Sequence, residues 1–360
     1  MSPLRRVIAE AIAQDGPISV ERYMRLSLSH PLHGYYRTRD PFGRAGDFVT
    51  APEISQMFGE FIGLWAVECW SRMGRPPRLS LVELGPGRGT LLADALRAAR
   101  VLPECRAALS LHLVETSRKL RAQQSASLAD CALPIAWHER LDEVPAGPMV
   151  VIANEFFDAL PIRQFTRQAK AWHERLIGLC EDSSLAFGLS PKAELSLALV
   201  AAEGAVLEIS PEGIALAGAL ARRVVADGGA ALIIDYGHVK RGFGDTLQAV
   251  QAHGFADPLA SPGEADLTAH VDFAALGEAA RKEGAVLHGP VTQGDYLRAL
   301  GIETRARRLK SAATLEQATA IDAALARLAG EGEGEMGALF KAMAISDPRL
   351  GSLAGFAAGR

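Results

Sequence analysis

The chain of 360 residues carries 38 basic and 42 acidic residues, a formal net charge of −4, and 49% of its residues are hydrophobic. The nearly balanced charge gives no pervasive basic field, which argues against a nucleic-acid coat protein and predicts no nucleic-acid partner. No apolar run approaches the roughly 20 residues that a membrane-spanning helix needs, so we expect no membrane insertion. The length exceeds one average domain and predicts a main domain with a large insertion or second lobe.

The cysteines and the first residues bear on the compartment. The four cysteines lie far apart without a CxxC pair, so we predict neither a disulfide framework nor a structural zinc site, and no metal. The opening MSPLRRVIAEAIAQDGPIS has no long apolar segment and carries early acidic residues. It does not resemble a secretory signal or a cleaved organelle presequence. These features predict a cytoplasmic protein.

Helical sequence opens the chain and leads into a long loop. Residues 2–30 have helical apolar periodicity, broken at Gly16 and Pro17, and Ser19 is placed to cap a second helix. Residues 30–55 are rich in glycine and proline and include four aromatic residues. Their length and aromatic content predict an ordered lid over a functional site. Residues 55–74 predict an amphipathic helix.

Strand-like and helix-like segments then alternate. The apolar strand candidates are residues 79–84, 109–115, 134–139, 149–155 and 230–237. Apolar strands that alternate with helices predict a parallel sheet covered on both faces, and therefore an α/β fold. Residues 163–229 interrupt this pattern with short strand-like runs and a helix, which predicts an inserted β-rich lobe. We interpret residues 240–265 as a further loop, and residues 284–291 and 337–346 as two final strands.

These segments predict four parts of the chain. Residues 1–74 form the N-terminal helices and lid, residues 75–162 a Rossmann-like nucleoside-binding core, residues 163–229 an inserted substrate-side lobe, and residues 230–360 the rest of the core sheet with substrate-side loops.

The segment ELGPGRG, residues 83–89, joins the first core strand to a helix. Glycines let the backbone turn sharply and let a ligand approach it closely. A dinucleotide site would use GxGxxG with pyrophosphate at the helix N-terminus, but the spacing here is GxGxG and Glu83 would repel a pyrophosphate. A carboxylate at this place suits a ligand that is cationic near the loop, such as S-adenosylmethionine; the alternative is a surface charge at a strand end. The second strand ends in Glu115, which can accept hydrogen bonds from two ribose hydroxyls.

Two further loops follow later strands of the predicted sheet. Leu141 and Asp142, after the third strand, are candidates to flank an adenine. The fourth strand runs into ANEFFDALP, which offers Asn154, Glu155 and Asp158. Because ligands in open parallel sheets bind beyond the carboxyl ends of the strands, we expect this loop beside the glycine loop. Two carboxylates can hold a guanidinium by charge-assisted hydrogen bonds. The alternative is that Asp158 caps a helix and Glu155 is solvated.

With these motifs in place, the chain resembles the MidA-type class I methyltransferases over nearly its whole length. The resemblance rests on HPLHGYYRTRDPFGRAGDFVTAPEISQMFGE, VELGPGRGTL, ANEFFDALPIRQF, LIIDYG, DTLQA, PGEADLTAHVDF and MGALFKAMAIS. It implies a seven-stranded class I methyltransferase sheet, Rossmann-like, that binds S-adenosylmethionine. The mitochondrial members are protein arginine methyltransferases needed for assembly of respiratory complex I. The absence of a presequence points to a bacterial member.

The resemblance also assigns site residues. The cofactor-binding set is Glu83, Gly85, Pro86, Gly87 and Gly89 at the methionine end, Glu115 and Thr116 at the ribose, Leu141 and Asp142 at the base, and Asp47, Thr50, Glu53 and Ser55 from the lid. Glu155, Asp158 and Asn154 are the catalytic candidates. The residues expected to line the substrate channel are Tyr35, Tyr36, Phe157 and Tyr236.

Three other functions stay open at this point. The chain could be an assembly factor that binds S-adenosylmethionine and has secondary or no transferase activity. It could methylate a small molecule, since no residue here requires a protein substrate. A nicotinamide oxidoreductase is disfavoured by Glu83 and by the GxGxG spacing.

Overall fold

The computed structural model describes residues 2–39, 50–332 and 334–356, and the chain divides into two compact units. Unit 1 comprises residues 1–48, 158–215 and 238–274, and unit 2 comprises residues 49–157, 216–237 and 275–360. This division differs from the predicted parts, because the strands of the inserted lobe group with the N-terminal helices. Within the described residues, no helix is long and apolar enough to cross a membrane.

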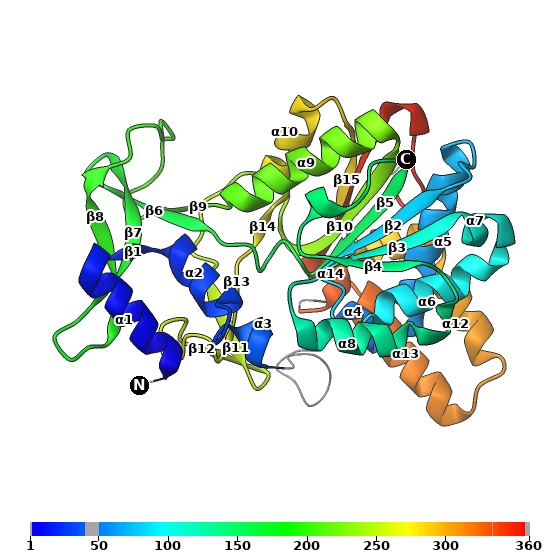
Figure 1. Ribbon diagram of the computed structural model, residues 1–360, viewed down its shortest axis with the longest axis horizontal. Helices are drawn as coiled ribbons and strands as arrows, with labels where there is room; N and C mark the ends of the chain where they lie inside the picture. The colour runs from blue at the N-terminus through cyan, green and yellow to red at the C-terminus, as the bar shows by residue number, and fades with distance from the viewer. Residues whose placement is uncertain (1, 40–49, 333, 357–360) are drawn as a thin grey trace. The chain divides into compact units, whose positions relative to one another are not determined.

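Unit 2 contains the core sheet (Figure 1). Its strands are β2 (Leu79–Leu84), β3 (Leu109–Val114), β4 (Ile135–His138), β5 (Met149–Asn154), β10 (Gly229–His238), β15 (Val286–Thr292) and β16 (Phe340–Ser346). They follow the order β15-β16-β10-β5-β2-β3-β4, and β14 (Val271–Asp272) pairs with β10 as the eighth strand of this sheet. Strands β4, β3, β2, β5 and β10 are parallel, whereas β16 is antiparallel to both β10 and β15. This is the class I methyltransferase sheet that the resemblance implied.

Helices cover this sheet. Those with residues in unit 2 are α4 (Ala51–Ile54), α5 (Gln56–Arg72), α6 (Thr90–Ala98), α7 (Pro103–Ala108), α8 (Arg118–Ser127), α9 (Pro211–Asp227), α10 (Phe273–Lys282), α11 (Gln293–Leu300), α12 (Ile302–Lys310), α13 (Leu315–Ala329) and α14 (Met336–Leu339). Helix α5 packs Phe58, Ile62 and Trp65 into a core that also contains Val150 and Ile152 of β5. Val151, which alternates with these two strand residues, is also fully buried. Burial of both faces explains why the core strands are apolar throughout.

Unit 1 contains the N-terminal helices and two smaller sheets. Its elements are α1 (Pro3–Asp15), β1 (Ile18–Ser19), α2 (Val20–Ser29), α3 (Tyr35–Thr38), β6 (Arg163–Gln168), β7 (Ala171–Leu179), β8 (Leu185–Ala193), β9 (Val206–Ile209), β11 (Gln248–Gln251), β12 (Gly254–Ala256), β13 (Asp266–Thr268) and β14 (Val271–Asp272). The larger sheet has the order β1-β7-β6-β9 with β8 also paired to β7. Apolar residues of α1 and α2, such as Ile8 and Met24, pack with Ile177 of β7.

Part of the predicted loop 240–265 is a β-hairpin, so that prediction was wrong. Strands β11 and β12 pair antiparallel through Ala249–Ala256 and Val250–Phe255, and β11 also pairs with β13. The turn residues Ala252 and His253 both have positive φ, 50° and 61°. Such a turn is normally signalled by asparagine and glycine. The sequence therefore lacked the usual hairpin signal. In addition, β11 and β12 are too short to show the alternation of apolar and polar residues that marks a strand.

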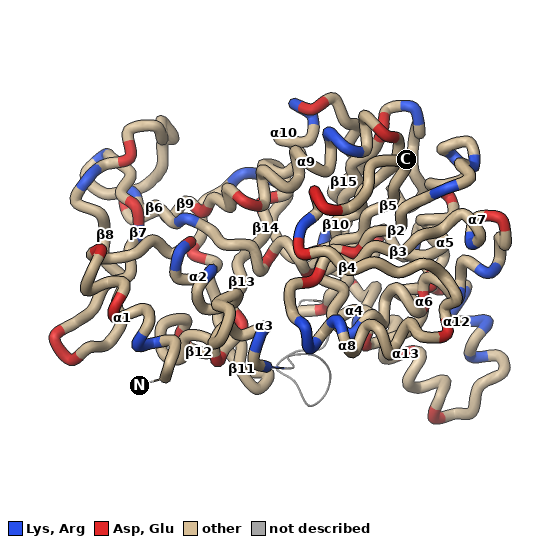
Figure 2. Tube along the Cα trace, in the orientation of Figure 1, with Lys and Arg blue, Asp and Glu red and all other residues tan. Residues whose placement is uncertain are grey.

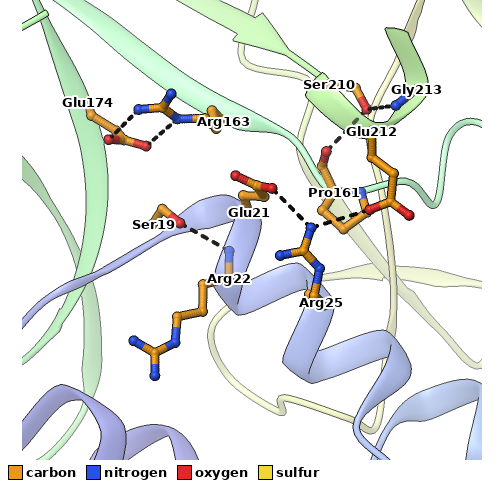
Figure 3. A network of polar contacts seen from close by, with 10 residues as sticks. All are labelled: Ser19, Glu21, Arg22, Arg25, Pro161, Arg163, Glu174, Ser210, Glu212 and Gly213. Atoms are coloured by element: carbon orange, nitrogen blue, oxygen red, sulfur yellow. Dashed lines mark hydrogen bonds and ion pairs between the residues drawn. The ribbon is translucent and has the colours of Figure 1, made fainter. Parts of the chain in front are cut away.

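Charged contacts in unit 1 link helix α2 to the first turn of α9, and strand β6 to strand β7 (Figure 3). The Arg25 guanidinium donates to Glu21 at 3.0 Å and to Glu212 at 3.3 Å. Arg163 of β6 binds Glu174 of β7 through two hydrogen bonds of 2.8 and 2.9 Å. Figure 2 shows acidic and basic residues interspersed along the chain.

Candidate active site

The glycine loop follows β2 and leads into α6. Gly85, Gly87 and Gly89 have φ values of 63°, 52° and 82°, which favour glycine. A Cβ atom on Gly85 would lie 2.7 Å from Cδ2 of Phe156, and one on Gly89 would lie 3.4 Å from Cα of Gln124. The three glycines therefore allow both the turn and, at Gly85 and Gly89, close packing against two neighbouring segments. The turn is closed by a 2.7 Å hydrogen bond from the Gly89 amide to the carbonyl of Pro86.

Glu83, at the end of β2, is a buried carboxyl group. Its side chain is only 3% exposed, so it is not the surface charge that the alternative reading required. Burial raises the pKa of Glu83 to about 8. Within the described residues, its Oε2 atom has no hydrogen-bond partner. A buried carboxyl group that lacks a partner is costly in its charged form, and a cationic group brought beside it would remove that cost. The residue therefore fits the charge of S-adenosylmethionine.

Glu115, directly after β3, is buried and oriented by several donors. Its Oε1 atom accepts a 2.7 Å hydrogen bond from the Ser117 amide, and its Oε2 atom accepts one of 3.3 Å from Nε2 of Gln124. Burial raises the pKa of Glu115, and the donors of Ser117, Gln124 and the Thr116 amide oppose that rise. An oriented carboxylate with two oxygens fits the role of a ribose acceptor.

Leu141 and Asp142 lie in a short 3₁₀ helix, η3 (Leu141–Glu143), after β4. Leu141 is buried, and its carbonyl accepts a 2.8 Å hydrogen bond from Arg223 of α9. A second nitrogen of Arg223 donates to the carbonyl of Pro145 at 2.7 Å. Asp142 is exposed and accepts two hydrogen bonds, of 3.0 and 2.6 Å, from Arg140. Arg223 thus holds the loop that carries both candidate adenine contacts.

The acidic loop begins at the end of β5. The Asn154 amide donates to Oε1 of Glu155 at 3.0 Å, and the backbone amide of Ala51 donates to the same atom at 3.1 Å. Glu155 has a φ of +50°, which is unusual for a residue other than glycine. Such backbone strain is typical of functional sites. The ring of Phe156, the next residue, lies against Gly85, so the acidic loop and the glycine loop are neighbours in unit 2.

Asp235, in the LIIDYG motif of β10, orients this acidic loop, and sequence reasoning gave it no role. Its side chain is fully buried. Its Oδ2 atom accepts hydrogen bonds from the amides of Phe156 and Phe157 at 3.2 and 3.0 Å, and its Oδ1 atom accepts from Tyr236 at 2.9 Å. The signal available in the sequence was a charged residue inside an otherwise apolar strand candidate.

The end of the predicted lid contacts the helix that follows the glycine loop. The hydroxyl of Thr90, the first residue of α6, donates to Glu53 at 2.7 Å. Ser55 caps α5 by accepting from the Met57 amide at 3.2 Å, and Thr50 precedes α4. Asp47, the remaining lid candidate, lies outside the described residues.

The predicted substrate residues are divided between the two units. In unit 1, Tyr35 is fully buried, and the Tyr36 hydroxyl donates to Asp266 at 2.9 Å. Burial, together with the negative charges of Asp266 and Asp158, raises the pKa of Tyr36. The chain after Asp158 leads into strand β6, so the reading of Asp158 as a helix cap was wrong. In unit 2, Tyr236 packs edge-on against another aromatic ring.

Unit 2 therefore presents a mostly parallel sheet, a glycine loop, a buried acid beside that loop and an oriented acid after the next strand. These features are those of a Rossmann-like nucleoside-binding protein, and the buried Glu83 fits a ligand that is cationic near the glycine loop.

The comparisons with known proteins agree with this class. A family model described as "Putative S-adenosyl-L-methionine-dependent methyltransferase" matches residues 61–291. The chain is 39% identical over 337 residues to "Protein arginine methyltransferase NDUFAF7, mitochondrial" of Mus musculus, covering 86% of this chain and 76% of that protein. It is 39% identical over 375 residues to the Drosophila melanogaster homolog, covering 95% and 84%. A Burkholderia thailandensis protein crystallised with S-adenosyl-homocysteine superposes with a TM-score of 0.86 at 30% identity, covering 99% and 95%.

The chain belongs to this family of S-adenosylmethionine-dependent methyltransferases. The predicted fold class, enzyme class and cofactor are thereby confirmed.

Proposed function

We propose that this enzyme methylates an arginine guanidinium of a protein substrate, and that Glu155 and Asp158 hold that guanidinium. The observation that carries the proposal is the position of the acidic loop, which begins with Glu155 and packs Phe156 against Gly85 of the glycine loop. The relatives at 37–39% identity that bear the name protein arginine methyltransferase support the choice of acceptor.

The chemistry explains why acids are needed. A guanidinium is a poor nucleophile because its charge is delocalised and its pKa exceeds about 12. Carboxylates that accept hydrogen bonds from two of its nitrogens concentrate the positive charge there and leave the third nitrogen richer in electrons. The bound cofactor supplies an electrophilic methyl group and its own leaving group. The chain orients the acceptor, and Glu155 or a water molecule accepts the proton that the methylated nitrogen loses.

We propose distinct roles for Glu155 and its neighbours from their hydrogen bonds. Asn154 and the Ala51 amide both donate to one oxygen of Glu155, which fixes the direction of the carboxylate. Asp235 holds the two amides that follow. We propose Phe157 and Tyr236 as contacts to the substrate peptide, and Glu83, Gly87 and Glu115 as contacts to the cofactor.

The test separates cofactor binding from transfer. Glu155→Gln and Asp158→Asn should keep affinity for S-adenosylmethionine in calorimetry within about twofold, yet lose about 100-fold or more of methyl transfer from labelled cofactor to proteins of a lysate that lacks this enzyme. Glu303→Gln, at an exposed position of α12, is the matched control and should change neither. Unchanged turnover in both acidic-loop variants would remove these roles.

The substrate and the compartment extend the proposal. We propose a subunit of respiratory complex I as the substrate and the bacterial cytoplasm as the compartment. All four cysteines are free, which fits a reducing compartment. Mass spectrometry of the labelled band would identify the subunit. Full rescue of a deletion strain by Gly87→Val, a change in the glycine loop that should block cofactor binding, would favour an assembly factor without transferase activity.

A further inference from the structure

Helix α8 carries a polar residue where its spacing calls for an apolar one. The buried side chains of this helix are Leu120 and Gln124, four residues apart on one face. Gln124 is fully buried. A buried amide is costly unless its hydrogen bonds are made, and an apolar residue of the same size would avoid the cost. Packing alone therefore does not explain why this position is a glutamine.

The contacts of Gln124 supply that reason. Its Nε2 atom donates to the carbonyl oxygen of Gly87 at 2.8 Å and to Oε2 of Glu115 at 3.3 Å. Its Oε1 atom accepts a 2.9 Å hydrogen bond from the indole nitrogen of Trp137, on strand β4. Because both Gly87 and Glu115 present acceptors, only a group with two donor hydrogens can join them. The indole N–H of Trp137 fixes which way the amide faces.

We propose that Gln124 is a positioning residue that couples the glycine loop to the ribose-binding carboxylate, and thereby sets the preference for a ribose with a free 2′-hydroxyl group. The proposal rests on the proposed role of Glu115. Gln124 does not itself contact the ligand in this account. Its hydrogen bond helps to fix the orientation of the Glu115 carboxylate. The Ser117 amide binds the other carboxylate oxygen at 2.7 Å. Gln124 also packs against Gly89, so the loop, helix α8 and the carboxylate form one rigid arrangement.

Removal of the amide should act on two properties of Glu115. Without the side-chain donor of Gln124, the carboxylate can rotate away from the hydroxyls whose hydrogen bonds it accepts. Since the Gln124 hydrogen bond opposes the rise of the Glu115 pKa, its loss also moves that pKa further up. Glu115 would then take up a proton at a higher pH, and a neutral carboxyl group is a weaker acceptor. Ribose recognition should fail at a higher pH than in the native protein.

The experiment measures ribose discrimination. S-adenosyl-homocysteine and its 2′-deoxy analogue are titrated into the native protein and into Gln124→Met by calorimetry between pH 5 and 8. A hydrogen bond to a charged acceptor corresponds to about a 10-fold or larger preference for the ribose ligand in the native protein. In Gln124→Met that ratio should fall below about threefold, and the pH at which affinity for the ribose ligand is lost should rise. Trp137→Phe should shift the ratio in the same direction by a smaller factor.

A matched control separates positioning from general loss of stability. Gln293 is a second fully buried glutamine of unit 2, and its amide donates to the Leu328 carbonyl at 2.8 Å. Gln293→Met should lower the melting temperature to a similar extent and leave the discrimination ratio unchanged. Equal ratios in native protein and Gln124→Met would overturn the proposal. A native protein with no preference for the 2′-hydroxyl group would instead overturn the role of Glu115.

Discussion

Replacement of Glu83 by glutamine gives the sharpest test of how the glycine loop selects its ligand. The carboxyl group is buried, and burial raises its pKa from the usual 4.5 to about 8. The folded protein therefore keeps this proton up to about pH 8, whereas the unfolded chain loses it near pH 4.5. At about 1.4 kcal/mol per pH unit, the ionised group costs the empty protein about 5 kcal/mol at high pH.

The sign of the pH dependence follows from the proton count. Between pH 4.5 and 8 the folded state binds more protons than the unfolded state, so the contribution of Glu83 to the free energy of unfolding falls as pH rises. Glu83→Gln carries no titrating group at this position and lacks that fall. Its stability relative to the native protein should improve by up to about 5 kcal/mol between pH 4.5 and 8, as measured by denaturant unfolding of both proteins without cofactor.

The pH dependence of cofactor affinity should have the opposite sign to that of stability. A cationic ligand beside Glu83 favours its ionised form, so binding to the native protein releases a proton and the affinity rises with pH up to about 8. The α-amino group of the ligand titrates near pH 7.7–8.0 in both proteins, and comparison of the two removes its contribution. Calorimetry in buffers of different ionisation heat measures the released proton. Parallel stability curves, together with equal proton release by native protein and Glu83→Gln, would refute this account of the site.

Three further outcomes are expected. Gly85→Ala forces a Cβ atom against Phe156 and a non-glycine residue into a positive φ, which costs about 1–2 kcal/mol; cofactor affinity should fall at least about 10-fold in calorimetry. Asp235→Asn removes the negative charge and points an NH2 group at one or more of the three backbone amides that now donate to the carboxylate, so methyl transfer in the labelled-cofactor assay should fall more steeply than cofactor affinity. Arg223→Ala frees the carbonyls of the loop 141–145 and should weaken adenosine binding about 10-fold, with methyl transfer at saturating cofactor unchanged.

Local sequence patterns were sufficient for the parallel core of the sheet. Every residue of β5 and the first seven residues of β10 are buried, and largely apolar runs of that kind can be recognised without any tertiary information. The glycine loop and the acids at strand ends could also be predicted. Glycines mark the turn directly, and residues that follow parallel strands lie at the same edge of the sheet. The hairpin of β11 and β12 was not, since Ala252 and His253 adopt its turn only when the surrounding strands hold them there.

The sequence by itself determined the kind of fold and the residues that we propose to face its cofactor. Only the tertiary structure decided that Glu83 is buried and short of a partner, that Asp235 holds the acidic loop, and that Gln124 joins Gly87 to Glu115. These facts depend on contacts between residues 9 to 79 positions apart, or on exclusion of water by the whole core. Propensity and spacing describe neighbours along the chain, whereas hydrogen-bond partners and desolvation are set by packing between distant segments.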